Sequence, residues 1–256
     1  MSKIIAITGK GGVGKTTIAS LIITRLIVNN CRPILAVDAD PNTCLDIALG
    51  INVGKTVGRI REEAKEIAGK GLASGISKQQ LLELKIAESL VEGDDFDYIA
   101  MGRPEGPGCY CYANNVLKDV LGEITSHYPY VVLDNEAGLE NLSRRIVQKV
   151  DLLIFVGDPS RRGLDTIVRL YELTRDMDIK YNRSAIIVNR QQWIELNDDA
   201  KRLQDVTQSD FLFGLQENDE IRMVSEKGKS MFEVSEKNEI IQTIDGFIKG
   251  QFKISQ

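Results

Sequence analysis

Apolar runs of the length of β-strands alternate with helical segments along the whole chain. Several runs, such as 131–133 and 152–156, are apolar at consecutive positions, which is typical of strands covered on both faces. This alternation predicts an α/β fold, a mostly parallel sheet with helices on both faces. The predicted strands lie near residues 3–8, 33–38, 97–101, 130–134, 152–156, 184–189 and 211–215.

The chain shows no Pro/Ser-rich linker, internal repeat or low-complexity tract, and its 256 residues suit one large α/β domain. We therefore expect a single domain over residues 1–256. Residues 54–96 are richer in charge and glycine, and we interpret them as a helical excursion with loops. Ligands of such sheets bind at the carboxyl ends of the strands, so the functional residues should follow the predicted strands.

Composition excludes several classes of function. Hydrophobic residues make up 43% and charged residues 27%, the balance of a globular protein. The net charge of −5 and the absence of a basic cluster argue against a nucleic-acid partner. No apolar run approaches the length of a membrane span, and the first strand begins directly after Ser2. We expect a cytoplasmic protein with no cleaved signal and no membrane partner.

A phosphate-binding motif occupies residues 9–17, whose sequence is Gly-Lys-Gly-Gly-Val-Gly-Lys-Thr-Thr. A strand-like run precedes it and an apolar helical pattern follows, which is the context of a phosphate loop. Its glycines allow a tight turn in which successive N–H groups face phosphate oxygens. Lys15 is expected to reach the terminal phosphates, and the Thr16 hydroxyl to ligate Mg²⁺. The predicted nucleotide cradle comprises Gly11, Gly12, Val13, Gly14, Lys15, Thr16 and Thr17.

Carboxylates follow two of the predicted strands. The run 130–134 ends in Asp134, an arrangement typical of Walker B aspartates, which hold Mg²⁺ through water. Asp38 and Asp40 lie at the end of the second strand. A helix-capping role is the alternative for Asp40. Glu136 is either a second catalytic carboxylate or a surface residue.

A second lysine in the loop, Lys10, indicates which class of phosphate-loop protein this is. The string at 10–17 resembles the deviant phosphate loop of the MinD/ParA/nitrogenase-iron-protein class of dimeric ATPases. The resemblance implies a homodimer in which Lys10 contacts the partner subunit's nucleotide and closure depends on ATP. It also implies that Asp40 positions or polarises the attacking water, and that Asp38 acts through the water shell of Mg²⁺. Lys10, Lys15 and Asp40 are thus the candidate catalytic residues for hydrolysis of ATP to ADP.

The same resemblance indicates where the base binds. In this class, the Asn at the end of the sixth strand contacts the adenine edge, and here that residue is Asn189, followed by Arg190. A turn-forming Asn is the alternative. The segment 214–219 is expected to add base contacts, although it lacks the Pro that is usual in the class.

Two of the four cysteines, Cys109 and Cys111, lie in a Gly/Pro-rich stretch within residues 103–112. A single intervening residue makes a poor disulfide, whereas thiolates are ligands for Ni²⁺, Zn²⁺, Cu⁺ or iron–sulfur clusters. Two thiols do not complete a metal site, but two subunits related by a two-fold axis bring four. Unligated loop cysteines are the alternative. Cys31 and Cys44 are interpreted as semi-buried packing residues.

The combined motifs resemble the CooC-type nickel-insertion ATPases, the maturation factors of carbon monoxide dehydrogenase. That resemblance implies an ATP-dependent homodimer that binds Ni²⁺, with Zn²⁺ as a substitute, and serves a nickel enzyme, carbon monoxide dehydrogenase. An ATP-dependent iron–sulfur reductase of the nitrogenase-iron-protein type is the alternative, although 134–138 lacks the cysteine of that class. A MinD/ParA-type positioning ATPase is the third candidate, and the tail 250–256 is short for its membrane helix.

Overall fold

The computed structural model describes residues 2–59, 80, 84, 86–102, 122–139, 149–193 and 195–252. Within these residues, seven strands form one sheet in the order β3-β2-β4-β1-β5-β6-β7, and all neighbouring strands are parallel. This confirms the predicted fold class. The strands are β1 (Lys3–Gly9), β2 (Ile34–Asp38), β3 (Phe96–Ala100), β4 (Tyr130–Asp134), β5 (Val150–Gly157), β6 (Tyr181–Gln191) and β7 (Phe211–Gln216).

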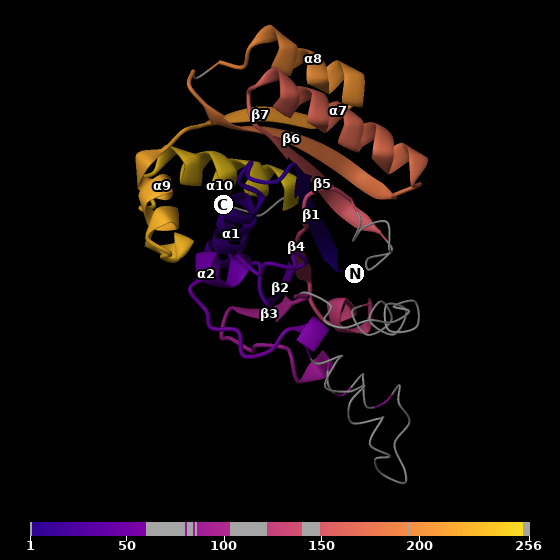
Figure 1. Ribbon diagram of the computed structural model, residues 1–256. Coiled ribbons are helices and arrows are strands. Elements are labelled where there is room, and N and C mark those ends of the chain that lie inside the picture. Colours follow the sequence, from indigo (N-terminus) through magenta and orange to yellow (C-terminus); the bar gives the residue numbers. More distant parts are fainter. Residues whose placement is uncertain are drawn as a thin grey trace.

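Helices cover both faces of the sheet, as Figure 1 shows. One face carries α7 (Arg161–Asp176) and α8 (Asp198–Thr207). Both helices begin at a side-chain cap, because Ser160 and Asn197 accept a hydrogen bond from the backbone N–H three residues later. The other face carries α1 (Lys15–Val28), α2 (Leu45–Leu49), α9 (Asp219–Glu226), the 3₁₀ turn η1 (Met231–Glu233) and α10 (Glu239–Phe252).

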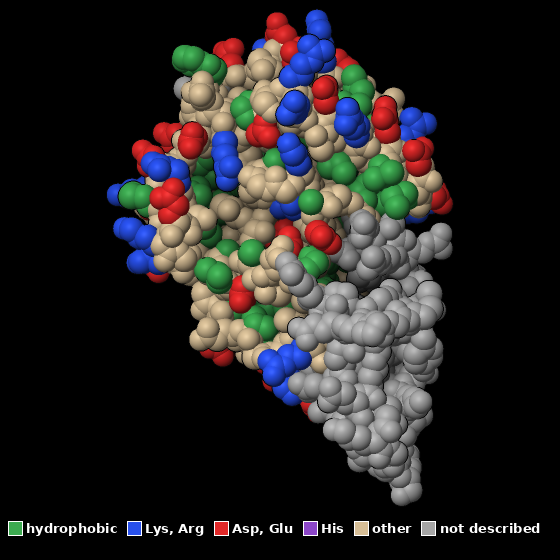
Figure 2. All heavy atoms as spheres, viewed as in Figure 1, with side chains coloured by type: hydrophobic (Ala, Val, Ile, Leu, Met, Phe, Trp, Pro, Cys, Tyr) green, Lys and Arg blue, Asp and Glu red, His purple; other side chains and the backbone are tan. Residues whose placement is uncertain are grey.

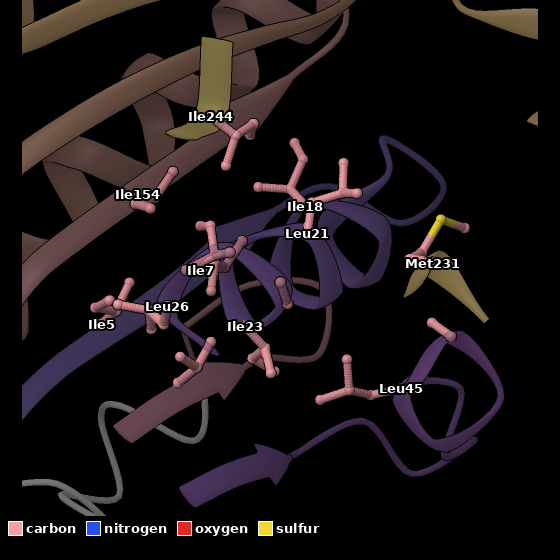
Figure 3. Packing of buried hydrophobic residues seen from close by; sticks show 14 of the residues in the cluster. Ile5, Ile7, Ile18, Leu21, Ile23, Leu26, Leu45, Ile154, Met231 and Ile244 are labelled. Atoms are coloured by element: carbon pink, nitrogen blue, oxygen red, sulfur yellow. The ribbon is translucent and has the colours of Figure 1, made fainter. Parts of the chain in front are cut away.

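The two faces have separate hydrophobic cores, because successive side chains of a strand point to opposite sides. In β1, Ile5 and Ile7 pack on the side of α1, while Ala6 packs on the side of α7. In the view of Figure 3, Ile7 lies near Ile18 and Leu21 of α1, and Ile5 lies near Leu26 of the same helix. The central strands β1, β2, β4 and β5 are buried on both sides of the sheet, which explains their continuous apolar runs.

The central strand β1 lies between β4 and β5. The chain crosses from β1 to β2 on one side of the sheet, and later continues from β5 to β7 on the other. The strand order therefore reverses at β1, and ligands of open parallel sheets bind at this kind of position. The loop after β1 is the predicted phosphate loop.

Some expectations differ from the structure or lie outside it. Asn189 and Arg190 belong to β6, which runs to Gln191, whereas the sequence pattern placed the end of this strand at residue 189. Cys31 is buried as expected, but Cys44 is exposed, so its interpretation as a packing residue is wrong. The loop 103–112, with its two cysteines, and most of 54–96 lie outside the described residues. Among the described helices, none is long and apolar enough to cross a membrane.

The close approach of β1 and β5 makes Gly9 a stability determinant. A Cβ at Gly9 would lie 2.3 Å from the carbonyl oxygen of Val156, a backbone atom of the neighbouring strand. We expect Gly9→Ala to lower the free energy of unfolding by about 2 to 4 kcal/mol. Unfolding in urea measures this change in free energy, and Gly246→Ala is the control. Gly246 is exposed in α10 with open space around it, so alanine there should add about 0.5 to 1 kcal/mol. Equal effects of the two substitutions would contradict this argument.

Candidate functional site

The phosphate loop connects the end of β1 to the start of α1. Gly12 and Gly14 have φ angles of 81° and 95°, which residues with a side chain rarely adopt. Gly14 is the N-cap of α1, and it brings no side chain to the first backbone N–H groups of the helix. A helix N-terminus of this kind presents N–H groups and a positive dipole end to an anion.

Lys15 lies at the base of this loop, and only 7% of it is exposed. Its Nζ donates a hydrogen bond to the carbonyl oxygen of Lys10 at 3.2 Å. Burial lowers the pKa of Lys15, while the nearby carboxylates of Asp134, Asp40 and Glu136 raise it. Half-buried Glu136 thus acts on the site through its charge. Lys10 itself is exposed, so one lysine of the motif faces the site and the other faces solvent.

Asp134, at the end of β4, is 1% exposed. Burial raises the pKa of this carboxyl to about 7, against the lowering effect of a hydrogen bond with the Thr16 side chain. Its Oδ1 is buried and has no hydrogen-bond partner among the described residues. A hard cation prefers oxygen ligands, so an unpartnered carboxylate oxygen beside a hydroxyl fits Mg²⁺ or one of its water ligands.

Asp38 is fully buried, and both of its carboxylate oxygens accept hydrogen bonds. The backbone N–H of Asp40 donates to Oδ1 at 3.0 Å, while Leu45 N–H and the Tyr98 hydroxyl donate to Oδ2 at 3.0 and 3.1 Å. Burial raises the pKa of Asp38, and these bonds oppose that rise. Asp38 therefore orders the segment after β2. Tyr98 lies 60 residues from Asp38 along the chain, and no pattern in the sequence indicated its role.

Asp40 lies in the turn that Asp38 orders. Its Oδ1 accepts hydrogen bonds from the backbone N–H and the side-chain amide of Asn42, at 2.8 and 3.0 Å. This contact is a turn within the loop and not a helix cap, because α2 begins at Leu45 with Cys44 as its N-cap residue. The same carboxylate also acts on the pKa of Lys15, so Asp40 lies near enough to influence the site by charge.

Two polar contacts that sequence reasoning missed join β1 to the segment after β4. The backbone N–H and the side-chain amide of Asn135 donate to the carbonyl oxygen of Ile7, at 3.2 and 2.9 Å. The Thr8 hydroxyl donates to the carbonyl oxygen of Gly138 at 2.7 Å. The only signal for Asn135 was a polar residue directly after a buried strand. Together these bonds fix the segment that follows Asp134 against the central strand.

A cavity of ≈ 330 Å³ opens beside Gly14. Its apolar wall comes from α1, β7, α9 and α10, and its polar wall includes Asn189 and Arg190. Figure 2 shows a hollow near the centre of this face, over α1 in the view of Figure 1. The Asn189 amide donates to the carbonyl oxygen of Val13 at 2.8 Å, and Arg190 Nη1 donates to that of Gly12 at 3.1 Å. A cavity with one apolar and one polar wall next to a phosphate loop has the form of a nucleotide site.

The structure therefore gathers most predicted site residues at one edge of the sheet. The loop 10–17, Asp38, Asp40 and Asp134 lie at the carboxyl ends of β1, β2 and β4, and Asn189 lies near that of β6. In the described part of the chain, no group of three or more His, Cys, Asp or Glu side chains could hold a metal ion. Cys109 and Cys111 are outside that part.

Comparisons with known proteins agree with this geometry. The sequence profile of a family described as "AAA domain" matches residues 2–187. An uncharacterized ATP-binding protein of Methanocaldococcus jannaschii is 40% identical over 246 residues, which cover 94% of this chain and 95% of that protein. The carbon monoxide dehydrogenase accessory protein CooC of Rhodospirillum rubrum is 32% identical over 190 residues, which cover 69% of this chain and 70% of CooC.

The fold is also shared with solved structures. The septum site-determining protein MinD of Pyrococcus horikoshii, complexed with Mg-ADP, superposes with a TM-score of 0.70 and 19% sequence identity. The match covers 99% of this chain and 97% of that one, so the likeness extends over the whole fold. The family match establishes that the chain belongs to the AAA domain family, and with the ATP-binding relative it identifies the chain as a P-loop ATPase that has the fold of MinD.

Proposed function

We propose that this ATPase is a nickel-insertion accessory protein for carbon monoxide dehydrogenase. In this proposal, Cys109 and Cys111 from two subunits bind Ni²⁺, and ATP hydrolysis promotes its transfer to the client enzyme. The observation that carries the proposal is the Cys-x-Cys pair in a chain 32% identical to an accessory protein of that enzyme. Thiolates are suitable ligands for Ni²⁺ and also accept Zn²⁺.

The nucleotide site supplies the ATP-dependent step. Residues 11–17 hold the phosphates through backbone N–H groups and the Lys15 ammonium, which lies buried beside them. The Thr16 hydroxyl and the Asp134 carboxylate would hold Mg²⁺, directly or through its water, and the ion would neutralise charge that develops on the phosphates. Asp40 positions the attacking water, and Asp38 orders the turn in which Asp40 lies.

The proposed dimer explains the second lysine of the motif. Lys10 is exposed, while its carbonyl oxygen accepts the bond from Lys15. An exposed ammonium at the rim of the loop is available to the partner subunit's nucleotide. Closure of the dimer on ATP would bring two copies of the cysteine loop together on the two-fold axis and complete a four-sulfur site. Hydrolysis then loosens the dimer and weakens this site.

Removal of the cysteines tests the metal site. We expect the wild-type protein with ATP to retain about one Ni²⁺ per dimer, because four thiolates complete one coordination sphere. The Cys109→Ser/Cys111→Ser variant should retain none, as measured by elemental analysis after gel filtration. Cys44→Ser is the matched control, because Cys44 is an exposed thiol outside the pair. Unchanged nickel in the double variant would reject the proposed site, whereas loss in the control as well would reject its assignment to this pair.

The iron–sulfur reductase differs in the metal that the same thiols hold. Anaerobic reconstitution with iron and sulfide, followed by visible absorbance, separates the two functions. We expect no stable four-iron chromophore, because the segment after Asp134 has no cysteine. A stable, redox-active cluster would overturn the nickel proposal in favour of the reductase.

A further inference from the structure

Two adjacent residues of β6 hold the phosphate loop by its carbonyl oxygens. Asn189 Nδ2 donates to the oxygen of Val13 at 2.8 Å, and Arg190 Nη1 donates to that of Gly12 at 3.1 Å. The partners are separated by 176 and 178 residues of sequence. Arg190 adopts a φ of 59°, a left-handed conformation that is uncommon for a residue with a side chain. Two donors from one strand end thus meet two consecutive peptide groups of the loop.

Holding a carbonyl oxygen also sets the direction of an N–H group. A trans peptide is planar, so its C=O and the following N–H point in opposite directions. The bond to Val13 therefore turns the Gly14 N–H away from β6, and the bond to Gly12 does the same for the Val13 N–H. N–H groups of the phosphate loop are the groups that cradle phosphate in this motif.

The loop needs such support because its glycines are conformationally permissive. Gly12 has no atom within 4 Å of where a Cβ would lie, so side-chain packing does not fix it there. At Gly14 the situation differs, since a Cβ would lie 2.5 Å from the Asn189 amide nitrogen. The Asn189 amide therefore packs directly against the Gly14 backbone, in the wall of the cavity proposed for the base.

We infer that Asn189 and Arg190 are positioning residues for the phosphate loop, which orient the N–H groups that bind phosphate whether or not a base is present. Asn189 then serves the base cavity and the phosphate loop with one carboxamide. Arg190 acts on the loop from the exposed side. The inference rests on the proposed nucleotide site, and it deepens the role of Asn189 beyond a base contact.

A ligand without a base separates the two roles of Asn189. Inorganic tripolyphosphate with Mg²⁺ carries the phosphates of ATP and no adenine. Loss of the bond to the loop carbonyl should weaken binding of tripolyphosphate about tenfold in Asn189→Ala, as measured by isothermal titration calorimetry. The same variant should bind ATP more weakly by at least the same factor. Arg190→Ala should weaken the binding of both ligands equally, by a few-fold. Unchanged tripolyphosphate affinity in Asn189→Ala would overturn the inference and leave a base contact alone.

Two further variants keep the result interpretable. Ile221 lines the cavity from α9, and among the described hydrogen bonds it has none with the loop. Ile221→Ala should therefore weaken the binding of ATP and leave the binding of tripolyphosphate unchanged. Lys15→Gln should weaken both ligands, which establishes that tripolyphosphate occupies the phosphate loop. If Lys15→Gln had no effect on either ligand, the proposed nucleotide site itself would be wrong. Thermal melting of each ligand-free variant verifies that it is folded.

Discussion

Lys15→Gln is expected to lower ATP hydrolysis at least about 100-fold and to weaken ATP binding by one to two orders of magnitude. The Lys15 ammonium is buried at the base of the phosphate loop, where nearby carboxylates act on it, so the substitution takes a buried positive charge out of the site. Glutamine keeps much of the side-chain length and removes the charge. Single-turnover hydrolysis and calorimetric ATP binding measure the two effects.

The matched control is the other lysine of the motif. Lys10 is exposed, and only its carbonyl oxygen contacts Lys15, so Lys10→Gln leaves the hydrogen bond of Lys15 intact. We expect this variant to bind ATP within about twofold of wild type, since its ammonium serves the partner's nucleotide in the proposed dimer. Its ATP-dependent dimer should be lost, as measured by light scattering. Loss of ATP binding in both variants to the same degree would contradict the assignment of Lys10 to the partner subunit.

Asp134→Asn is expected to abolish Mg²⁺-dependent hydrolysis and, at the same time, to stabilise the nucleotide-free protein. The native carboxylate is buried, and its Oδ1 has no partner among the described residues. The charged form is therefore costly, and the pKa rises from 3.8 to about 7. Such a shift corresponds to a cost on the order of 4 kcal/mol above pH 7. Asparagine removes the charge but leaves an unpaired amide, so the net gain should be on the order of 2 kcal/mol.

The pH dependence follows from the sign of the shift. A carboxyl whose pKa is raised on folding binds protons more tightly in the native state, so its contribution is fully favourable below its unfolded value of 3.8. That contribution is lost as the pH rises towards 7. Urea unfolding in EDTA should therefore show Asp134→Asn gaining on the wild type between about pH 4 and pH 7, with the full difference above pH 7.

Asp38→Asn is the control, because Asp38 is also a buried carboxylate. Its two oxygens accept three hydrogen bonds, and an amide group in that place would face donors. We expect Asp38→Asn to destabilise the protein by about 1 to 3 kcal/mol. If both substitutions stabilised the protein at pH 8, burial alone would explain the result. If both substitutions destabilised the protein, the unpartnered Asp134 carboxylate would not destabilise the native state as we propose.

Much of the fold could be predicted from the sequence. Each strand buried on both faces leaves a continuous apolar run, and all seven predicted runs overlap strands of the sheet. The largest boundary error is at β6, which was expected over 184–189 and runs from Tyr181 to Gln191. Polar residues flank its apolar run at both ends but do not end the strand, because Arg183 still pairs with Leu152 of β5 and Gln191 with Gln216 of β7. Hydrophobic periodicity reports burial, and it ends where burial ends rather than where backbone pairing does.

The candidate site was only partly predictable for a related reason. The phosphate loop could be predicted because strand, turn and helix are adjacent in the sequence. The bond from Tyr98 to Asp38, and those from Asn189 and Asn135 to backbone carbonyl oxygens, join segments far apart in the chain. Whether a buried oxygen of Asp38 or Asp134 has a partner depends on which strand ends meet, and no local pattern contains that information.

The sequence by itself determined that this protein is an α/β nucleotide-binding chain, with Lys15, Asp38, Asp40 and Asp134 at strand ends, because these signals are local. Only the tertiary structure decided how those residues differ. The sheet order β3-β2-β4-β1-β5-β6-β7 places the ends of β2 and β4 beside the phosphate loop. It leaves Asp38 fully hydrogen-bonded and one oxygen of Asp134 without a partner. Hydrogen bonding and desolvation act over a few ångströms in space, and neighbours at that distance are set by the packing of the sheet.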